Sequence, residues 1–217
     1  MSRHALLFDL DGTLVDSARD IAAALTQVSR ARGGGDVAAA TVRPLVSLGA
    51  PTLVARALGP VAGDPALDLS AFRTVLRAAP SDPAIVFHGV AHALSTLATQ
   101  GWRMAIVTNK PHALAMALLA THRLDRFFAA VVGGDTAAAS KPDPAPLRHA
   151  LATLGTVPER ALFIGDSDVD AAAAAALSIP LLVYRGGYGV ADIAADQAAG
   201  WFERFDDLPA LVAAHRG

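Results

Sequence analysis

The 217-residue sequence contains no cysteine. Disulfide bonds, thiolate nucleophiles and cysteine-based zinc sites are therefore excluded, and a reducing compartment fits this composition. The chain also lacks any apolar run near the ~20 residues that a helix needs to cross a bilayer. Its first apolar run, at Ala5–Phe8, is too short for a secretory signal and has no small-residue cleavage site. These absences predict a cytoplasmic protein that does not act at a membrane.

An excess of either charge is missing as well. The 18 lysines and arginines nearly balance the 20 aspartates and glutamates, which gives a formal net charge of −2. This balance gives no electrostatic reason to expect nucleic acid as a partner. Hydrophobic residues make up 53% of the chain, enough for a buried core. The length suits one α/β domain with an insertion, or two small lobes, and nothing in the sequence predicts the oligomeric state.

Short apolar runs alternate with helical patterns over most of the chain. Continuous apolar runs of this length are typical of strands that are buried on both faces of a parallel sheet. The runs are Ala5–Phe8, Met104–Val107, Ala129–Val132, Ala161–Ile164 and Leu181–Tyr184. Helical patterns between and after them cover Gly89–Gln100, His112–Ala120, Ala145–Leu154, Val169–Leu177 and Asp206–His215. The alternation predicts an α/β fold with a doubly wound, Rossmann-like parallel sheet.

One long segment, from Ser17 to Pro83, interrupts the alternation. It contains no strand-like run, and its apolar residues recur at helical spacing between glycine breaks such as Gly33–Gly35. We therefore predict a small helical cap at residues 17–83, inserted into an α/β core that is formed by residues 1–16 and 84–217.

Polar residues follow four of the predicted strands, in the loops that leave the sheet. In an open parallel sheet, ligands bind at the carboxyl ends of the strands, so these residues are expected to meet at one edge. In chain order they are Asp9 and Asp11, Thr108 and Asn109, Lys141, and Asp166 with Asp170. Each motif alone has an ordinary explanation as a turn or a helix cap. Their convergence on one edge predicts a functional site.

The carboxylates of this set suit the hydrolysis of a phosphate ester. A carboxylate can attack phosphorus and form an aspartyl phosphate, which divides the reaction into two steps. Because a carboxylate and a phosphate repel each other, a cation is needed between them, and Mg²⁺ prefers oxygen ligands. The predicted magnesium ligands are the carboxylates of Asp9 and Asp166 and the main-chain oxygen of Asp11. Asp170 is predicted to lie behind them and to orient a ligand or a water.

The other polar residues suit the substrate phosphate and the leaving group. Lys141 is predicted to neutralise a phosphate oxygen and to hold the nucleophile ionised, while Thr108 and Asn109 donate hydrogen bonds. Asp11 is placed to protonate the departing alkoxide and then to take a proton from water. Arg43 is a candidate for binding a second anion such as a substrate carboxylate, because guanidinium binds carboxylates with two hydrogen bonds. The alternative for Arg43 is a surface arginine of the cap.

Four motifs resemble those of the haloacid dehalogenase-type phosphatases, and they occur in the order of that family. They are Asp9–Ser17, Thr108–Asn109, Lys141–Pro142, and Gly165–Asp166 with Asp170. The inserted helical segment resembles the family's cap of the first type. Within the family, the segments Asp16–Ile21 and Val42–Ala50 are most similar to the phosphoglycolate phosphatase branch.

This resemblance implies a magnesium-dependent phosphatase that acts on a small phosphorylated metabolite, with 2-phosphoglycolate as the first candidate substrate. It implies that Asp9 is the nucleophile, Asp11 the general acid and base, and Lys141 a catalytic and phosphate-binding residue. It also implies that Thr108, Asn109 and Lys141 bind the phosphate. The implied magnesium ligands are Asp9, Asp11 and Asp166. Two positions depart from the family pattern, Arg19 in place of a proline and Phe87–Gly89 in place of Tyr-Pro-Gly, and they bear on the substrate and not on the reaction.

Several other functions compete with this one. A haloacid dehalogenase needs neither metal nor an acid two residues after the nucleophile, so Asp11 argues against it. A phosphomutase keeps Asp11 and stays open, as do sugar phosphates, nucleotides and pyrophosphate as substrates. A phospho-accepting receiver has no reason to carry such a cap, and a silent binding module would be expected to have lost a motif residue. The segment Gly186–Gly189 lacks dinucleotide-binding spacing and is interpreted as a loop.

Overall fold

The computed structural model describes residues 4–215. Within them, six strands form one sheet in the order β3-β2-β1-β4-β5-β6, and every neighbouring pair is parallel. The strands are β1 Ala5–Phe8, β2 Arg103–Val107, β3 Ala130–Val132, β4 Ala161–Gly165, β5 Leu181–Tyr184 and β6 Gly200–Phe202. The predicted α/β fold is confirmed. The sequence prediction missed β6 because this edge strand has three residues and no apolar run of its own.

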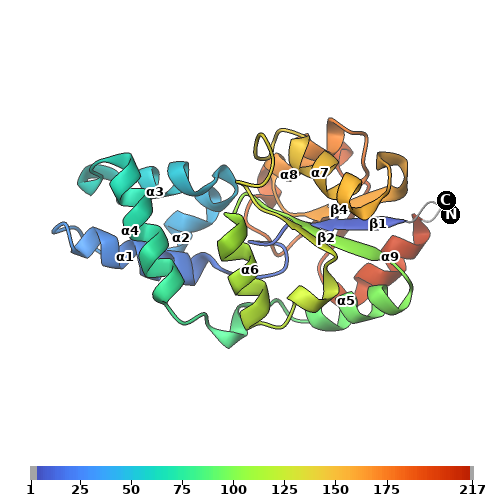
Figure 1. Cartoon of the computed structure of the whole chain (residues 1–217), viewed down its shortest axis with the longest axis horizontal. Coiled ribbons are helices and arrows are strands. Elements are labelled where there is room, and N and C mark those ends of the chain that lie inside the picture. Colours follow the sequence, from blue (N-terminus) through green and yellow to red (C-terminus); the bar gives the residue numbers. More distant parts are fainter. Residues whose placement is uncertain (1–3, 216–217) are drawn as a thin grey trace.

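Helices cover both faces of the sheet (Figure 1). Alternate residues of β1 enter different layers, because successive side chains of a strand point to opposite faces. Leu6 and Phe8 pack in one layer and Leu7 in the other. The first layer contains α5 (Val90–Thr99), α6 (His112–Thr121) and α9 (Leu208–Ala214), and the second contains α7 (Ala145–Leu154) and α8 (Asp168–Ala175).

The central position of β1 brings the predicted motifs together. Phe8 is in register with Ile106 of β2 on one side and with Ile164 of β4 on the other. The three strands therefore end at the same level, and the loops that begin at Asp9, Thr108 and Asp166 leave the sheet side by side. The parallel register places residues more than 150 positions apart in the sequence at one edge of the sheet.

Four helices form a separate lobe beyond this edge (Figure 1). They are α1 Ala18–Arg30, α2 Ala39–Val42, α3 Ala50–Leu58 and α4 Pro65–Ala78, and a 3₁₀ turn covers Arg43–Leu48. The lobe has its own apolar cluster, which includes Leu25 of α1, Leu53 of α3 and Phe72 of α4. We call this lobe the cap. The predicted boundary at 17 lies one residue before α1, and that at 83 falls in the 3₁₀ turn Pro83–Ile85; the division into two domains stays a prediction.

None of the helices within residues 4–215 is long and apolar enough to cross a membrane.

Candidate active site

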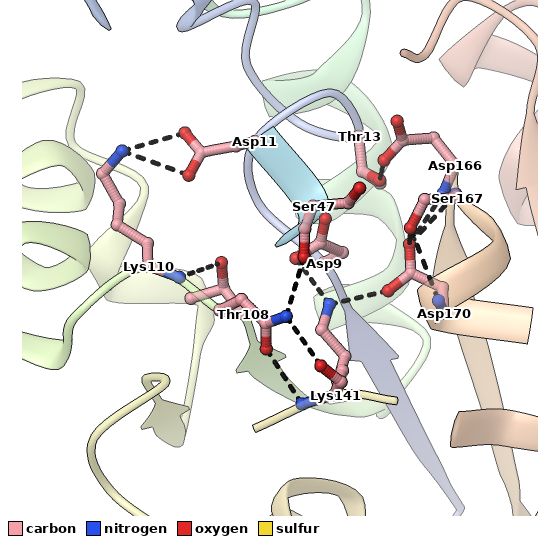
Figure 2. Close-up of polar contacts among 11 residues, drawn as sticks. Asp9, Asp11, Thr13, Ser47, Thr108, Lys110, Lys141, Asp166, Ser167 and Asp170 are labelled. Atoms are coloured by element: carbon pink, nitrogen blue, oxygen red, sulfur yellow. Dashed lines mark hydrogen bonds and ion pairs between the residues drawn. The ribbon is translucent and has the colours of Figure 1, made fainter. Parts of the chain in front are cut away.

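Asp9 and Lys141 form the centre of the site (Figure 2). The Lys141 ammonium lies 2.8 Å from Asp9 Oδ1 and 2.6 Å from Asp170 Oδ1. All three side chains are buried. Burial alone would lower the pKa of Lys141, but the carboxylates of Asp170 and Asp9 raise it above the usual range. Lys141 is therefore a permanently charged partner of Asp9.

Three buried carboxylates meet beside this lysine. Asp9, Asp166 and Asp170 each offer an oxygen within 4.8 Å of the others. Burial raises the pKa of Asp9 to about 7, while Lys141 opposes the rise and Asp170 adds to it. Burial also raises the pKa of Asp166 to about 8, with further contributions from Asp170 and Asp9. Such crowding is costly without a cation, and an all-oxygen donor set suits a hard divalent ion.

The carboxylate of Asp170 is held by the protein on both oxygens. Its Oδ1 accepts from Lys141, and its Oδ2 accepts from the main-chain N–H groups of Asp166 and Ser167 and from the Ser167 hydroxyl. The Ser167 hydroxyl in turn caps α8, which makes a reciprocal pair of bonds at the helix start. Asp170 accepts four such contacts, whereas Asp166 accepts two, from the Thr13 hydroxyl and the Tyr188 N–H. Asp170 therefore has the contacts of a supporting residue, and Asp166 keeps more of its acceptor capacity for a metal ion.

The Asp11 side chain points away from the three carboxylates (Figure 2). Lys110 Nζ lies 3.0 and 3.1 Å from its two oxygens, and the Ser17 hydroxyl donates to Asp11 Oδ1 at 2.5 Å. With the side chain turned away, the main-chain oxygen of Asp11 is the group that could bind magnesium. This is the role predicted from the sequence, and it stays a prediction. The side chain lines a cavity together with the cap residues Phe72 and Leu76.

Thr108 and Asn109 occupy the loop after β2. Thr108 is 3% exposed and lines the cavity at Asp9 and Asp11, and its hydroxyl accepts from the Lys110 N–H. Asn109 exchanges two hydrogen bonds of 2.9 Å with the main chain of Lys141, and its amide also donates to the Ser47 oxygen of the cap. Asn109 therefore ties together two core loops and the cap, and its predicted contact with phosphate stays a prediction.

Arg43 is bound to Asp16, in the segment Asp16–Ser17 that leads from the core into α1 of the cap and that we call the hinge. Its Nη2 lies 3.0 Å from Asp16 Oδ2, and the guanidinium is 5.8 Å from the centre of the Tyr188 ring. The Arg43 side chain is 45% exposed. In this arrangement the predicted clamp for a substrate carboxylate is already paired with a protein carboxylate. Its role toward substrate stays a prediction.

Tyr188 is a site residue that the sequence interpretation missed. Its main-chain N–H donates to Asp166 Oδ2 at 2.7 Å, and its hydroxyl donates to Asp16 Oδ1 at 2.6 Å. A β-carbon at the neighbouring Gly187 would overlap the Asp166 side chain. The Gly186–Gly189 segment is thus a close-packed support for Asp166. Its available sequence signal was a single tyrosine within a run of glycines.

The sequence interpretation also gave no role to four other residues that support the site. Thr13 donates to Asp166 Oδ1 at 2.6 Å. Ser17 and Lys110 hold Asp11, and Ser167 holds Asp170, as described above. Thr13, Ser17 and Ser167 lie inside or beside the recognised motifs, and Lys110 directly follows Asn109. Adjacency to a motif was therefore a usable signal for them.

The cap leaves little room above Asp9. The cavity between them has a volume of about 10 Å³ and is lined by Val46 and Ser47 of the cap and by core residues that include Asp9, Asp11 and Lys141. About one water fits such a space. We therefore expect a substrate to enter when the cap moves away from the core and to be shielded from bulk water when the cap returns.

The chain belongs to the haloacid dehalogenase-like hydrolases, whose family model matches residues 4–177. It is 39% identical over 213 residues to the "Phosphoglycolate phosphatase, plasmid" of Cupriavidus necator, over 96% of this chain and 92% of that protein. The crystal structure of a predicted phosphoglycolate phosphatase from Haemophilus somnus has a TM-score of 0.85 and 25% identity, over 98% of this chain and 99% of that one.

A further similar structure carries a ligand. A variant of CbbY from Rhodobacter sphaeroides, in complex with xylulose-(1,5)-bisphosphate, has a TM-score of 0.80 and 25% identity, over 96% of each chain. Together the matches confirm the family and the enzyme class that the sequence predicted, a phosphoric monoester hydrolase similar to phosphoglycolate phosphatases.

Proposed function

We propose that the protein is a magnesium-dependent phosphatase that hydrolyses 2-phosphoglycolate through an aspartyl phosphate on Asp9. The observation that carries the proposal is the buried group of Asp9, Asp166, Asp170 and Lys141, in which three carboxylates lie close together and two of them, Asp9 and Asp170, pair with the lysine. Most of this charge is held by the fold before any ligand arrives, so little reorganisation is needed during the reaction. The similarity to phosphoglycolate phosphatases supports the choice of substrate.

Asp9 is the nucleophile in the first step. Its carboxylate oxygen attacks phosphorus, the bond from phosphorus to the leaving oxygen breaks, and Asp11 donates a proton to that oxygen. Lys141 favours the ionised form of Asp9 through the 2.8 Å contact and neutralises charge on the phosphoryl group. When bound by Asp9, Asp166 and the Asp11 main chain, Mg²⁺ would supply charge neutralisation between the nucleophile and the phosphate.

Asp11 reverses its role in the second step. It takes a proton from a water that attacks the phosphorus of the aspartyl phosphate, so the acyl phosphate bond breaks and inorganic phosphate leaves. The same carboxyl group is left ready to donate a proton in the next cycle. In this scheme the small cavity limits the water that reaches the phosphorylated Asp9.

The test is phosphate release from a panel of small phosphomonoesters in the presence of Mg²⁺ or of EDTA. The panel contains 2-phosphoglycolate, hexose phosphates, nucleoside monophosphates and pyrophosphate. A preference for 2-phosphoglycolate that disappears with EDTA is expected. Equal rates across the panel would contradict the substrate while leaving the chemistry, and activity undiminished by EDTA would contradict the metal.

A sugar bisphosphate is the second candidate substrate. It is favoured by the xylulose-(1,5)-bisphosphate complex of the similar CbbY protein. Adding this compound to the panel separates the two candidates. A phosphomutase would instead move the phosphoryl group to a second sugar hydroxyl, which phosphorus NMR of the products would detect.

A further inference from the structure

Lys110 is a largely buried cation to which the proposed chemistry gives no task. Only 9% of its side chain is exposed, and its ammonium lies within 3.1 Å of both oxygens of Asp11, which is itself 7% exposed (Figure 2). A buried lysine must keep an anionic partner, because an unpaired buried charge is strongly unfavourable. In this structure the partner is the residue that is proposed to protonate the leaving group.

The position of Lys110 is that of a leaving-group contact. Lys110 lines the cavity at Asp9 and also a second cavity of about 30 Å³, which Asp11 shares with the cap residues Phe72 and Leu76. It also borders an outer cleft of about 100 Å³ near the hinge. Lys110 therefore stands where the phosphate site opens toward the cap, next to the acid that must touch the departing oxygen.

The other cations near the site lie at different groups. Lys141 lines the cavity at Asp9, but its ammonium is held between Asp9 and Asp170. Arg43 pairs with Asp16 at the hinge. Arg77 borders the outer cleft and is absent from the linings of the two cavities that contain Asp11.

We propose that Lys110 is the residue that selects a leaving group carrying a carboxylate. This inference rests on the proposed function. When the substrate binds, the Lys110 ammonium exchanges its contact with Asp11 for one with the substrate carboxylate. The exchange frees the Asp11 carboxyl group to meet the leaving oxygen and keeps Lys110 paired throughout.

Selection for a carboxylate follows from the free-energy cost of leaving the Lys110 ammonium without an anionic partner. A lysine ammonium is a compact charge on a flexible stem, so it can follow a carboxylate over a short distance. A neutral leaving group offers no anion in exchange, so either Lys110 is left unpaired or it retains Asp11 and blocks the acid. The substrate class is therefore a short phosphomonoester with an anionic carboxylate close to the ester oxygen.

The test compares two substrates of nearly the same shape, 2-phosphoglycolate and 2-hydroxyethyl phosphate, in which a hydroxymethyl group replaces the carboxylate. For the wild-type protein with Mg²⁺, kcat/KM is expected to be on the order of 100-fold higher for 2-phosphoglycolate. In Lys110→Met this ratio falls toward unity, mainly through KM for 2-phosphoglycolate, and Lys110→Arg restores part of it. Arg77→Met is the control and keeps the wild-type ratio.

A binding measurement gives the same answer without turnover. Calorimetric titration of 2-phosphoglycolate into Asp9→Asn is compared with titration into Asp9→Asn combined with Lys110→Met, after circular dichroism has verified the fold. The affinity should fall on the order of 100-fold in the double variant. Affinity for inorganic phosphate should fall far less.

Failure of the Lys110 inference and failure of the proposed function would give different results. If Lys110→Met slows both substrates equally, or if Arg43→Met collapses the ratio instead, the inference is wrong and the phosphatase proposal survives. If Lys110→Met lowers kcat/KM for xylulose-(1,5)-bisphosphate and leaves the 2-phosphoglycolate ratio unchanged, the selected anion is a phosphate. If the wild-type protein releases phosphate from none of these compounds, the proposed function itself fails.

Discussion

The core and the cap hold their polar groups in different ways. On the core side, Lys141 and Asp170 are almost fully buried, and Asp170 takes part in several hydrogen bonds at once. On the cap side, single hydrogen bonds join the lobes, as between the Asn109 amide and the Ser47 main-chain oxygen or between the Ala18 N–H and the Tyr188 hydroxyl. The Arg43–Asp16 pair of the hinge is 45% and 27% exposed.

This difference separates chemistry from access. Breaking a buried charge network costs about 3–5 kcal/mol, whereas exposed ion pairs contribute only ~0–1 kcal/mol. The core can therefore hold the reacting groups in place, while the cap contacts are weak enough to be made and broken in each turnover. Substitutions on the core side are expected to change the chemical steps, and those at the hinge to change substrate capture.

Removal of the nucleophile is expected to have the largest effect. Asp9→Asn keeps the shape of the side chain but cannot form the aspartyl phosphate. Phosphate release should fall by at least ~10⁴-fold, in line with the loss of a covalent nucleophile in other hydrolases. Steady-state assays report the rate, and circular dichroism verifies that the fold is retained. Activity near the wild-type level would rule out the covalent mechanism.

Asp11→Ala is expected to have the next largest effect. The attacking water then lacks its base, and general acid–base assistance contributes roughly 10²–10⁴-fold. The second step should slow more than the first, so phosphorylated enzyme should accumulate and be visible by intact-protein mass spectrometry after acid quenching. Ser17→Ala, which removes one bond to Asp11, is the milder comparison. Slow turnover without any trapped phosphoenzyme would argue against this order of steps.

The crowded carboxylates predict a pH-dependent response to Mg²⁺. A free aspartate has a pKa of 3.8, while the folded protein raises the pKa of Asp9 to about 7 and that of Asp166 to about 8. Between pH 4 and these values the unfolded chain binds fewer protons than the folded one. Without a divalent cation, stability should therefore fall as pH rises through this window.

Mg²⁺ binds the ionised carboxylates and so competes with these protons. The rise in Tm on adding Mg²⁺ should be larger at pH 8 than at pH 6, as measured by scanning calorimetry. Asp166→Asn should remove most of this difference, whereas Asp168→Asn, a neighbouring exposed carboxylate, should keep it. An equal Mg²⁺ effect at both pH values in the wild-type protein would be the contrary finding.

The arrangement of the core strands could largely be predicted from the sequence. Five strands were predictable because buried parallel strands need unbroken apolar runs, as in Ala161–Gly165. The meeting of Asp9 and Asp166 followed from the rule that parallel strands present their carboxyl ends at one edge. These features depend on where the strands begin and end along the chain, and local apolar patterns in the sequence indicate those positions.

Side-chain directions in the loops were not predictable. The pairs Lys110–Asp11 and Tyr188–Asp16 join residues 99 and 172 positions apart, and neither pair leaves a periodic trace in the sequence. The expectation that Arg43 reaches the substrate rested on residue type alone, and the structure shows the guanidinium bound to Asp16. Charged side chains at a hinge have several partners within reach, and only tertiary packing decides among them.

The smallest expected effect comes from removing the contact that the Tyr188 hydroxyl makes with the hinge. Tyr188→Phe removes the hydroxyl that donates to Asp16 and accepts from the Ala18 N–H, but it keeps the ring that packs with the cap cluster. The main-chain bond to Asp166 is also kept. A smaller closed population lowers the apparent affinity for substrate, so KM should rise by about 3- to 10-fold while kcat changes by less than about twofold.

Small-angle X-ray scattering supplies a readout that does not depend on turnover. Without substrate, Tyr188→Phe should have a larger radius of gyration than the wild-type protein, and a saturating concentration of substrate should remove the difference. Tyr188→Leu, which also removes the ring, should exaggerate both effects. If instead Tyr188→Phe lowers kcat and leaves KM and the radius of gyration unchanged, Tyr188 acts on Asp166 and the chemical step, and the hinge is not what its hydroxyl controls.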